Sequence, residues 1–194
     1  MSLQVTFQLT ETEQQLLLRI ARSAVLSYLS GETPRVPEVP TGVLTEAHGI
    51  FVSIHKRAEL RGCIGNIHPA GPLYRSTAEC AIAAAVGDPR FMPLMQVELA
   101  EVEFEISVLS PLERVENTEQ IEIGKHGLLI SKKSSRGLLL PQVASAYGWT
   151  RERFLEEACR KAGLHPNEWS DGATIHYFSA LVFSERQHRL TAAS

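Results

Sequence analysis

The densest set of reactive residue types in the chain lies in the six residues Leu60–Gly65, which read LRGCIG. This segment combines the thiol of Cys63, the guanidinium of Arg61 and two glycines. If the backbone is extended there, Arg61 and Cys63 share one face. A thiol with an ordinary pKa near ~8.5 is only about a tenth thiolate at pH 7.5, whereas a pKa lowered by ~1 unit would give roughly half. The spacing therefore predicts that Arg61 could activate Cys63 as a nucleophile.

The two glycines of the segment indicate a site for an anion. Gly62 and Gly65 permit positive φ and let backbone N–H groups face a ligand or an oxyanion without obstruction by a Cβ atom. The competing interpretation is structural. Free cysteine is among the most buried residue types, so Cys63 could be a small hydrophobic side chain of the core. Both interpretations stay open at the level of the sequence.

Two other positions could join this segment. Asp88 can accept hydrogen bonds from nearby backbone N–H groups and pair with Arg90, which is typical of a structural turn and also fits a ligand site. His126 stands at the start of an expected strand, from which its imidazole could act as the general base for Cys63. The alternative for His126 is a surface or hydrogen-bonded structural histidine.

Metal and nucleotide cofactors are not indicated by any motif. The seven histidines are isolated from one another, and no paired signature such as HExxH is present. Gly62 and Gly65 lack both the third glycine and the following βαβ unit of a dinucleotide-binding motif. We therefore expect no cofactor and no bound metal.

Hydrophobic periodicity outlines the elements that must position these residues. The expected helices are 11–29, 73–86 and one that begins after Thr150 and stops before Gly163. Thr10 and Glu13 form a capping box in front of the first helix. The expected strands are 49–56, 102–109, 127–131, 137–140 and 174–183. Helices of unequal length separate the expected strands, and the strand 102–109 has one polar, solvent-exposed face. Both features favour an α+β fold with an antiparallel or mixed sheet packed with helices.

Composition and charge favour one soluble domain. A chain of 194 residues with 44% hydrophobic residues can bury a core of its own. The formal net charge of −3, from 19 basic and 22 acidic residues, supplies no basic stripe, so we expect no nucleic-acid partner. An export signal and an apolar run of the ~20 residues that span a bilayer are both missing, so we expect no membrane association. Three widely spaced cysteines then indicate thiols in a reducing cytoplasm.

The LRGCIG string resembles the AMMECR family, named for a deleted chromosomal region that includes the Alport syndrome locus. The similarity continues, in the family's order, through Pro34–Pro37, Asp88–Pro93, Gly124–Gly127, Leu140–Val143, Gly148–Trp149 and Arg160–Gly163. It implies an α+β fold with a larger antiparallel-sheet lobe and a smaller lobe. It also implies a single domain over residues 10–184, a frayed tail at 185–194, and a cleft near Arg61–Gly65.

The resemblance implies no particular reaction, because the biochemical activity of the family is unassigned. Prokaryotic members are associated with a Memo-like protein and a radical-SAM protein, which makes these two the expected protein partners. The chain has no CxxxCxxC motif, so it would not itself be the radical-SAM component. Oligomeric state has no signature in the sequence.

Two functions from different classes follow. The first is a non-catalytic module whose cleft binds a small anionic ligand or a partner peptide; the ligand-binding residues would be Arg61, Gly62, Gly65, Asp88 and Arg90. The second is a cysteine-dependent enzyme, with Cys63 as nucleophile, His126 as base and the backbone of the two glycines as an anion hole. The environment of Cys63 distinguishes them, because the enzyme needs an imidazole within hydrogen-bond reach of the thiol.

Overall fold

The computed structural model describes residues 8–34, 36–38, 42–68 and 71–188, which form two compact units. The first and larger unit contains the chain up to Leu109 and again from Leu181. The second unit is the segment Ser110–Ala180 between them. The α+β fold with a larger and a smaller lobe is therefore confirmed, and the stretch 10–184 contains two units within one chain.

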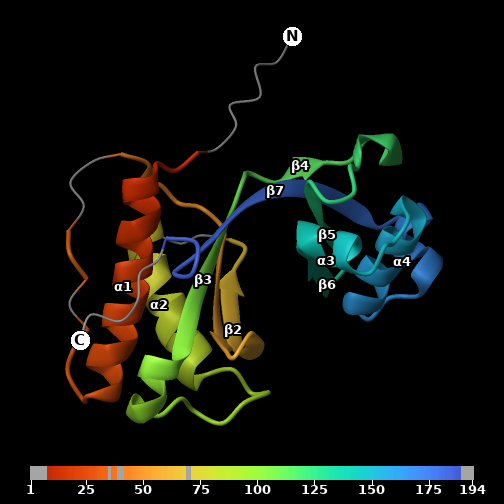
Figure 1. Cartoon of the computed structure of the whole chain (residues 1–194). Helices are drawn as coiled ribbons and strands as arrows, with labels where there is room; N and C mark the ends of the chain where they lie inside the picture. The colour runs from red at the N-terminus through yellow and green to blue at the C-terminus, as the bar shows by residue number, and fades with distance from the viewer. Residues whose placement is uncertain (1–7, 35, 39–41, 69–70, 189–194) are drawn as a thin grey trace. The chain divides into compact units, whose positions relative to one another are not determined.

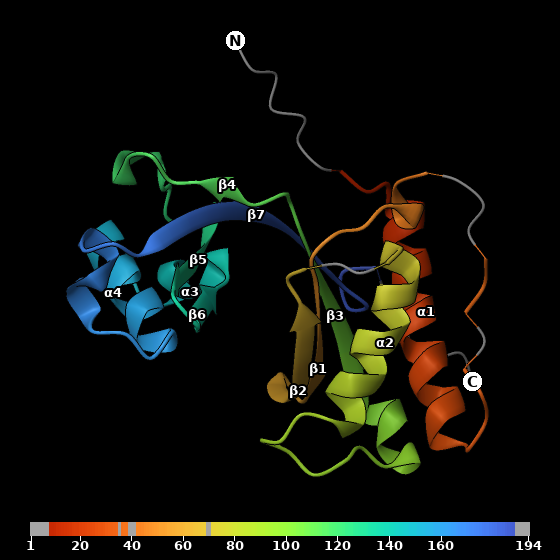
Figure 2. The same ribbon diagram turned by 180° about the vertical axis from the view of Figure 1, so that it is seen from behind.

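The first unit has helices on one face of an antiparallel sheet. Its elements are α1 (Glu11–Leu29), β1 (Ile50–Lys56), β2 (Glu59–Asn66), α2 (Leu73–Val86), β3 (Val102–Leu109) and the end of β7 (Thr174–Ser184). The strands β2, β1 and β3 lie side by side in that order, and each pair is antiparallel. The helices α1 and α2 pack against each other and against these strands (Figures 1 and 2).

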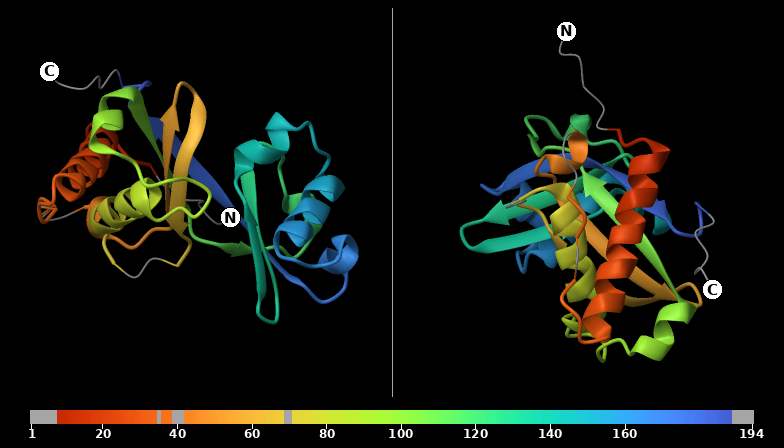
Figure 3. Two further views of the ribbon diagram at one scale, coloured as in Figure 1. Left: turned by 90° about the horizontal axis from the view of Figure 1, so that it is seen from below. Right: turned by 90° about the vertical axis from the view of Figure 1, so that its left-hand side faces the viewer.

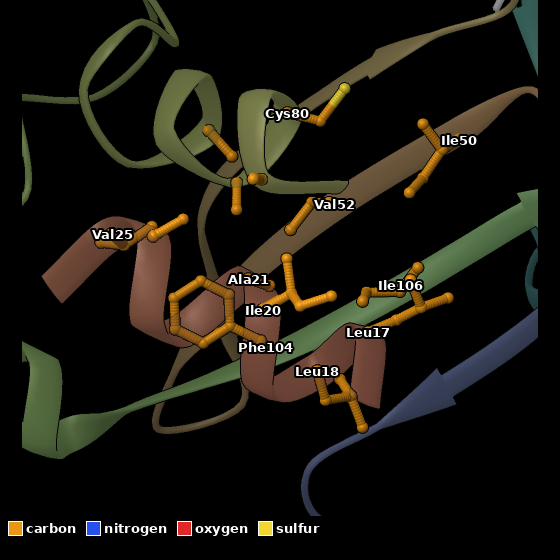
Figure 4. Close-up of a cluster of buried hydrophobic side chains, with 14 of the residues drawn as sticks. Leu17, Leu18, Ile20, Ala21, Val25, Ile50, Val52, Cys80, Phe104 and Ile106 are labelled. Atoms are coloured by element: carbon orange, nitrogen blue, oxygen red, sulfur yellow. The ribbon is translucent and has the colours of Figure 1, made fainter. Parts of the chain in front are cut away.

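The core of the first unit follows from the alternation along its strands. Val52 on β1 and Phe104 on β3 are buried, and they face Leu17 and Ala21 of α1 (Figure 4). The side chains between the apolar strand positions, such as Ser53, point to the opposite face of the sheet. This places polar and apolar residues of the same strands on two different faces, as the sequence pattern predicts.

The second unit is built on a hairpin and the first part of β7. Its elements are β4 (Glu113–Arg114), β5 (His126–Lys132), β6 (Ser135–Leu139), α3 (Pro141–Ala146) and α4 (Arg151–Lys161). β5 pairs with both β6 and β7, and β4 pairs with β7. The helix α4 packs on the hairpin (Figure 3), where a Cβ atom on Gly137 would lie 2.4 Å from the nitrogen of Ala162. Buried Phe154 and Leu155 of α4 fill the core between them.

Most of the expected elements are confirmed, and the differences are local. The capping box of Thr10 and Glu13 is present, and Thr150 caps α4. The tip of the β5–β6 hairpin has two residues, so both strands are longer there than predicted. The strand β2, which contains the LRGCIG segment, was not expected as a strand, and neither were the short elements α3 and β4 or the 3₁₀ helices Val43–Thr45, Gln96–Glu101, Thr118–Gln120 and Pro166–Ser170. Within the described ranges, no helix is both long and apolar enough to cross a membrane.

The expectation of a frayed tail from residue 185 is wrong for the described part of that tail. Glu185 is only 4% exposed, and its carboxylate accepts hydrogen bonds from Phe104 N at 2.9 Å and from Arg22 Nε at 2.5 Å. The Arg22 guanidinium also donates to the carbonyls of Leu99 and Val102. This ion pair attaches the tail to α1 and β3. Residues 189–194 lie outside the described residues.

We predict that Glu185→Gln lowers the free energy of unfolding by about 2–3 kcal/mol, because it leaves the Arg22 guanidinium without its counter-charge in a largely buried site. Glu116 is a suitable control, since its side chain is 77% exposed. Glu116→Gln should change stability by no more than about 0.5 kcal/mol. Chemical denaturation of both variants measures the difference, and equal stabilities would contradict the prediction.

Candidate functional site

The LRGCIG segment is part of β2, the end strand of the β2-β1-β3 arrangement, and is therefore extended. Cys63 lies opposite Ser53 of β1 on the sheet face away from the apolar core. The Ser53 Oγ donates a hydrogen bond to the Cys63 Sγ at 3.2 Å. The thiol is half-buried, and its described partner is a hydroxyl donor.

The backbone of Cys63 is held on the outer side of β2 by the Asp88–Arg90 turn. The Cys63 N–H donates to Asp88 Oδ2 at 2.9 Å, and Arg90 Nη2 donates to the Cys63 carbonyl at 3.4 Å. The backbone groups of Cys63 therefore point away from β1. Ser53 and Cys63 therefore form a non-hydrogen-bonded pair of the antiparallel ladder. In such pairs the facing side chains approach most closely. The structure thus brings together the two segments that carry the strongest sequence signal.

Asp88 has a structural role in this contact. Its carboxylate accepts from Arg90 Nε at 2.9 Å, Arg90 Nη2 at 2.7 Å and Arg90 N at 3.1 Å, besides Cys63 N. The Arg90 guanidinium, with smaller contributions from these N–H donors, holds the pKa of Asp88 well below its ordinary value, against the opposing effect of burial. The side chain is only 3% exposed. Asp88 is therefore fully occupied as an acceptor and unsuited to contact a ligand directly.

Arg61 is held by Glu98, which the sequence analysis did not single out. Arg61 Nη2 lies 3.0 Å from Glu98 Oε2, and Arg61 Nη1 donates to the Met92 carbonyl at 2.8 Å. Lys56 Nζ lies 3.1 Å from the other oxygen of Glu98. Arg61, with help from the Met95 N–H and Lys56, lowers the pKa of Glu98 to about 2. No described contact joins the Arg61 guanidinium to the thiol, so the predicted activation of Cys63 by Arg61 has no support in the geometry.

The two glycines of the segment allow close packing and do not form a turn. Neither is among the positive-φ glycines, so the positive φ that glycine permits is not used at Gly62 or Gly65. A Cβ atom on Gly62 would lie 2.1 Å from the carbonyl oxygen of Ala84 on α2. One on Gly65 would lie 2.2 Å from the Phe51 ring. Both positions therefore exclude a side chain for steric reasons.

His126 belongs to the second unit, whereas Cys63 belongs to the first. Its Nδ1 accepts a hydrogen bond from Glu122 N at 3.2 Å, and its ring stacks on Tyr177 with centroids 4.5 Å apart. Burial, with a smaller contribution from Lys125, lowers the pKa of His126. The lone pair of the neutral imidazole is thus engaged by Glu122 N–H, and the other nitrogen carries the proton. This arrangement suits a structural histidine better than a general base.

A surface hollow of about 440 Å³ lies at the β1–β2 turn, and we call it the cationic hollow. It is lined by Lys56, Arg57, Glu59, Leu60 and Arg61. Three of these side chains carry positive charge and one carries negative charge. The hollow therefore adjoins the start of the LRGCIG segment. The overlooked signal for it was Lys56–Arg57, a basic pair at the end of an alternating strand. Among the described residues, no cluster of three His, Cys, Asp or Glu side chains is arranged to hold a metal ion.

Comparison with known proteins assigns the chain to a family. The AMMECR1 family matches residues 18–183, which is most of the chain. The chain belongs to the AMMECR1 family. This confirms the resemblance that LRGCIG and the accompanying strings indicate.

Relatives of this AMMECR1 family chain include a protein of Methanopyrus kandleri, 43% identical over 190 residues and covering 93% of this chain and 92% of that protein. A protein of Pyrococcus furiosus is 41% identical over 189 residues, with coverages of 90% and 89%. The crystal structure of an uncharacterized protein from Pyrococcus horikoshii has a TM-score of 0.86 and 37% identity, covering 92% of this chain and 94% of that one. These similarities establish the fold, and fold membership alone does not supply chemistry.

We predict that Gly62→Ala destabilises the protein by about 1–3 kcal/mol, because the new methyl group would overlap the Ala84 carbonyl and force α2 away from β2. Gly71 provides a matched control, since a Cβ atom there would have no neighbour within 4 Å and its φ is not positive. Gly71→Ala should leave the denaturation midpoint unchanged or slightly raised. Equal midpoints for both variants would show that the contact at Gly62 is absent.

We also predict a specific acid sensitivity from Glu98. Its pKa falls from an ordinary 4.5 to about 2 on folding, so the carboxylate stabilises the fold fully above about pH 4.5. This contribution is lost as the pH falls from there towards 2. Melting temperatures of wild type and Glu98→Gln between pH 6 and 2 measure the effect. The variant should lose less stability than wild type across this window, and parallel curves would contradict the prediction.

Proposed function

We propose that this AMMECR1 family chain is a non-catalytic binding module, and that its site is the surface formed by the cationic hollow and the adjoining Cys63 segment. The ligand is a small anionic molecule or an acidic segment of a partner protein. The observation that carries this proposal is the cationic hollow itself, in which Lys56, Arg57 and Arg61 line one cavity next to Cys63 and its strand β2.

The rigidity of the surrounding backbone supports a binding role. Cys63 is hydrogen-bonded on its outer side by Asp88 and Arg90, and Arg61 is bonded to Glu98 and to the loop after α2. These contacts fix the surface before any ligand arrives. A preformed surface avoids the entropy of ordering loops on binding, so more of the contact energy appears as affinity.

The size and charge of the hollow also support an anionic ligand. Its volume of about 440 Å³ falls within the range of roughly 300–1,000 Å³ that small-molecule sites occupy. Glu98 accepts from both Arg61 and Lys56. Glu101 lies 3.4 Å from Lys56, so the cation left accessible to an anion is Arg57, whose side chain is 85% exposed. Leu60 adds an exposed apolar side chain at the rim. A ligand with a carboxylate or phosphate and a small apolar part fits this lining.

The described contacts favour binding over cysteine-dependent catalysis. The described partner of the thiol is the Ser53 hydroxyl at 3.2 Å, which is far too weak a base to take its proton. His126, the proposed base, already accepts a bond at Nδ1. An enzyme would need another proton acceptor beside Cys63. Native mass spectrometry of the purified protein separates the two functions: an intact bound anion favours the module, and turnover that alkylation of Cys63 abolishes favours the enzyme.

Protein partners and compartment extend the proposal. We take the Memo-like and radical-SAM proteins implied by the family resemblance as the first candidates to supply an acidic segment to the hollow. A reducing cytoplasm is the proposed compartment, because Cys63, Cys80 and Cys159 are all free thiols. Co-purification of either candidate with wild type, and its loss when the hollow is altered, would support this extension.

We predict that Cys63 is alkylated faster than the other two cysteines. Cys63 is half-buried, whereas Cys80 and Cys159 are buried. Burial, with a smaller effect of Glu79, raises the pKa of Cys80 to about 11, and burial also raises the pKa of Cys159. Few thiolates therefore form at these two positions near neutral pH. Timed iodoacetamide labelling with peptide mapping gives the three rates.

Replacement of the thiol tests its role in binding. Cys63→Ser should leave the melting temperature nearly unchanged and weaken binding of an anion found in the native-mass experiment. Cys80→Ser is the matched comparison, because a hydroxyl in its buried site should destabilise the fold by about 1–3 kcal/mol. The proposed site fails if Cys63 is the slowest cysteine to alkylate and its serine variant is the one destabilised by that amount.

A further inference from the structure

The turn between β1 and β2 has an unusual backbone for its residue types. Lys56 pairs with Glu59, so the loop consists of Arg57 and Ala58 alone. Both have positive φ, 53° and 66°, as in a type I′ hairpin turn. That turn favours Asn-Gly and similar pairs, since a Cβ atom disfavours the left-handed region. Arg57 and Ala58 are therefore poorly suited to the conformation they adopt.

Contacts within the protein do not explain why an arginine stands in this turn. The Arg57 side chain is 85% exposed, and its described contact is a distance of 4.0 Å between its Nη2 and Glu101 Oε2. Glu101 is itself half exposed, and an ion pair of that kind contributes little to stability. Unfavourable backbone conformations that persist in native proteins are concentrated at ligand-contacting sites.

The other two cations of the cationic hollow are already engaged. Lys56 Nζ lies 3.1 Å from Glu98 and 3.4 Å from Glu101. Arg61 is bonded to Glu98 and to the Met92 carbonyl, and its side chain is only 17% exposed. Turning either cation towards a ligand would break these contacts. Arg57 can turn towards the hollow without a comparable loss.

We propose that Arg57 is the ligand-recognising residue of the cationic hollow, and that it binds a carboxylate or phosphate group through the planar fork of its guanidinium. Two parallel N–H groups of this fork match two oxygens of either anion, a geometry that lysine cannot reproduce. The turn conformation places Arg57 at the wall of the hollow, while Lys56 and Arg61 form its fixed part. This inference rests on the proposed binding function and names the residue and the chemical group involved.

Calorimetric titration with inorganic pyrophosphate, citrate and a hexaglutamate peptide tests the inference, with a melting temperature for every variant. Arg57→Asn should weaken the affinity for the probe that wild type binds by at least about tenfold, on the scale of one charge-assisted bidentate contact. Its melting temperature should stay the same or rise by about 2–4 °C, because asparagine tolerates the left-handed conformation. Arg57→Lys keeps the charge without the fork and should show a smaller loss of affinity.

Two controls separate recognition from changes in the turn or in total charge. Ala58→Gly relaxes the same turn and keeps Arg57, so it should raise the melting temperature and retain wild-type affinity. Lys133 lies in the β5–β6 turn and also has a positive φ, 55°, but it does not line the hollow. Lys133→Asn therefore removes a cation from a similar backbone conformation elsewhere. It should also retain wild-type affinity.

The outcomes distinguish this inference from the proposal on which it rests. If wild type binds a probe and Arg57→Asn binds it equally well, the assignment to Arg57 is overturned and the binding module stands. If wild type binds none of the three probes at millimolar concentrations, both are overturned. The peptide and the two small anions show whether the group recognised belongs to a protein or to a small molecule.

Discussion

The contact of the Asp88 carboxylate with the backbone of Cys63 is the constraint on which the site depends. It joins the end of α2 to the outer strand of the sheet, 25 residues apart in the chain. The same carboxylate orients Arg90, which completes the contact by donating to the Cys63 carbonyl. An outer strand usually leaves such groups open to pairing with another chain. Here they are satisfied within the unit, so β2 presents its side chains and not its backbone at this point.

The charges around this strand divide into carboxylates that are held by pairing and an exposed cation at the turn. Glu98 holds Arg61 in a site with little access to water, and Asp88 is itself buried although its partner Arg90 is 56% exposed; the pairing secures the ionisation of both carboxylates. Such pairs fix positions and contribute specificity of arrangement more reliably than net stability. Among the cations that line the cationic hollow, the one left largely in solvent is Arg57 at the turn. Fixed side chains at Lys56 and Arg61, together with one mobile side chain at Arg57, are the combination expected of a surface that selects a ligand.

Local features of the fold could be predicted from the sequence because their causes are local. The capping box before α1 and the alternation of β1 and β3 depend on residues a few positions apart, and all three elements formed where expected. The partners of Arg61 and Arg22 lie 37 and 163 residues away, and no periodicity reports such contacts. The sequence pointed to Gly62 for its backbone freedom, whereas the position requires glycine because α2 passes close to β2 there. That close contact exists only in the folded chain. The sequence therefore singles out the segment of the candidate site but not the charge network around it.

The position of β7 has a consequence for the order of folding during synthesis. Residues Ser110–Ala180 form an unbroken stretch and can collapse as soon as they have been made. The larger unit cannot be completed until Leu181–Ser184 and Glu185 follow, because Arg22 finds its counter-charge only there. A nascent chain would thus hold the first 109 residues in an incomplete state while the inserted segment is translated, contrary to the usual N-terminal-first order. Of the described elements, the last strand to be made therefore closes the unit that contains the first helix.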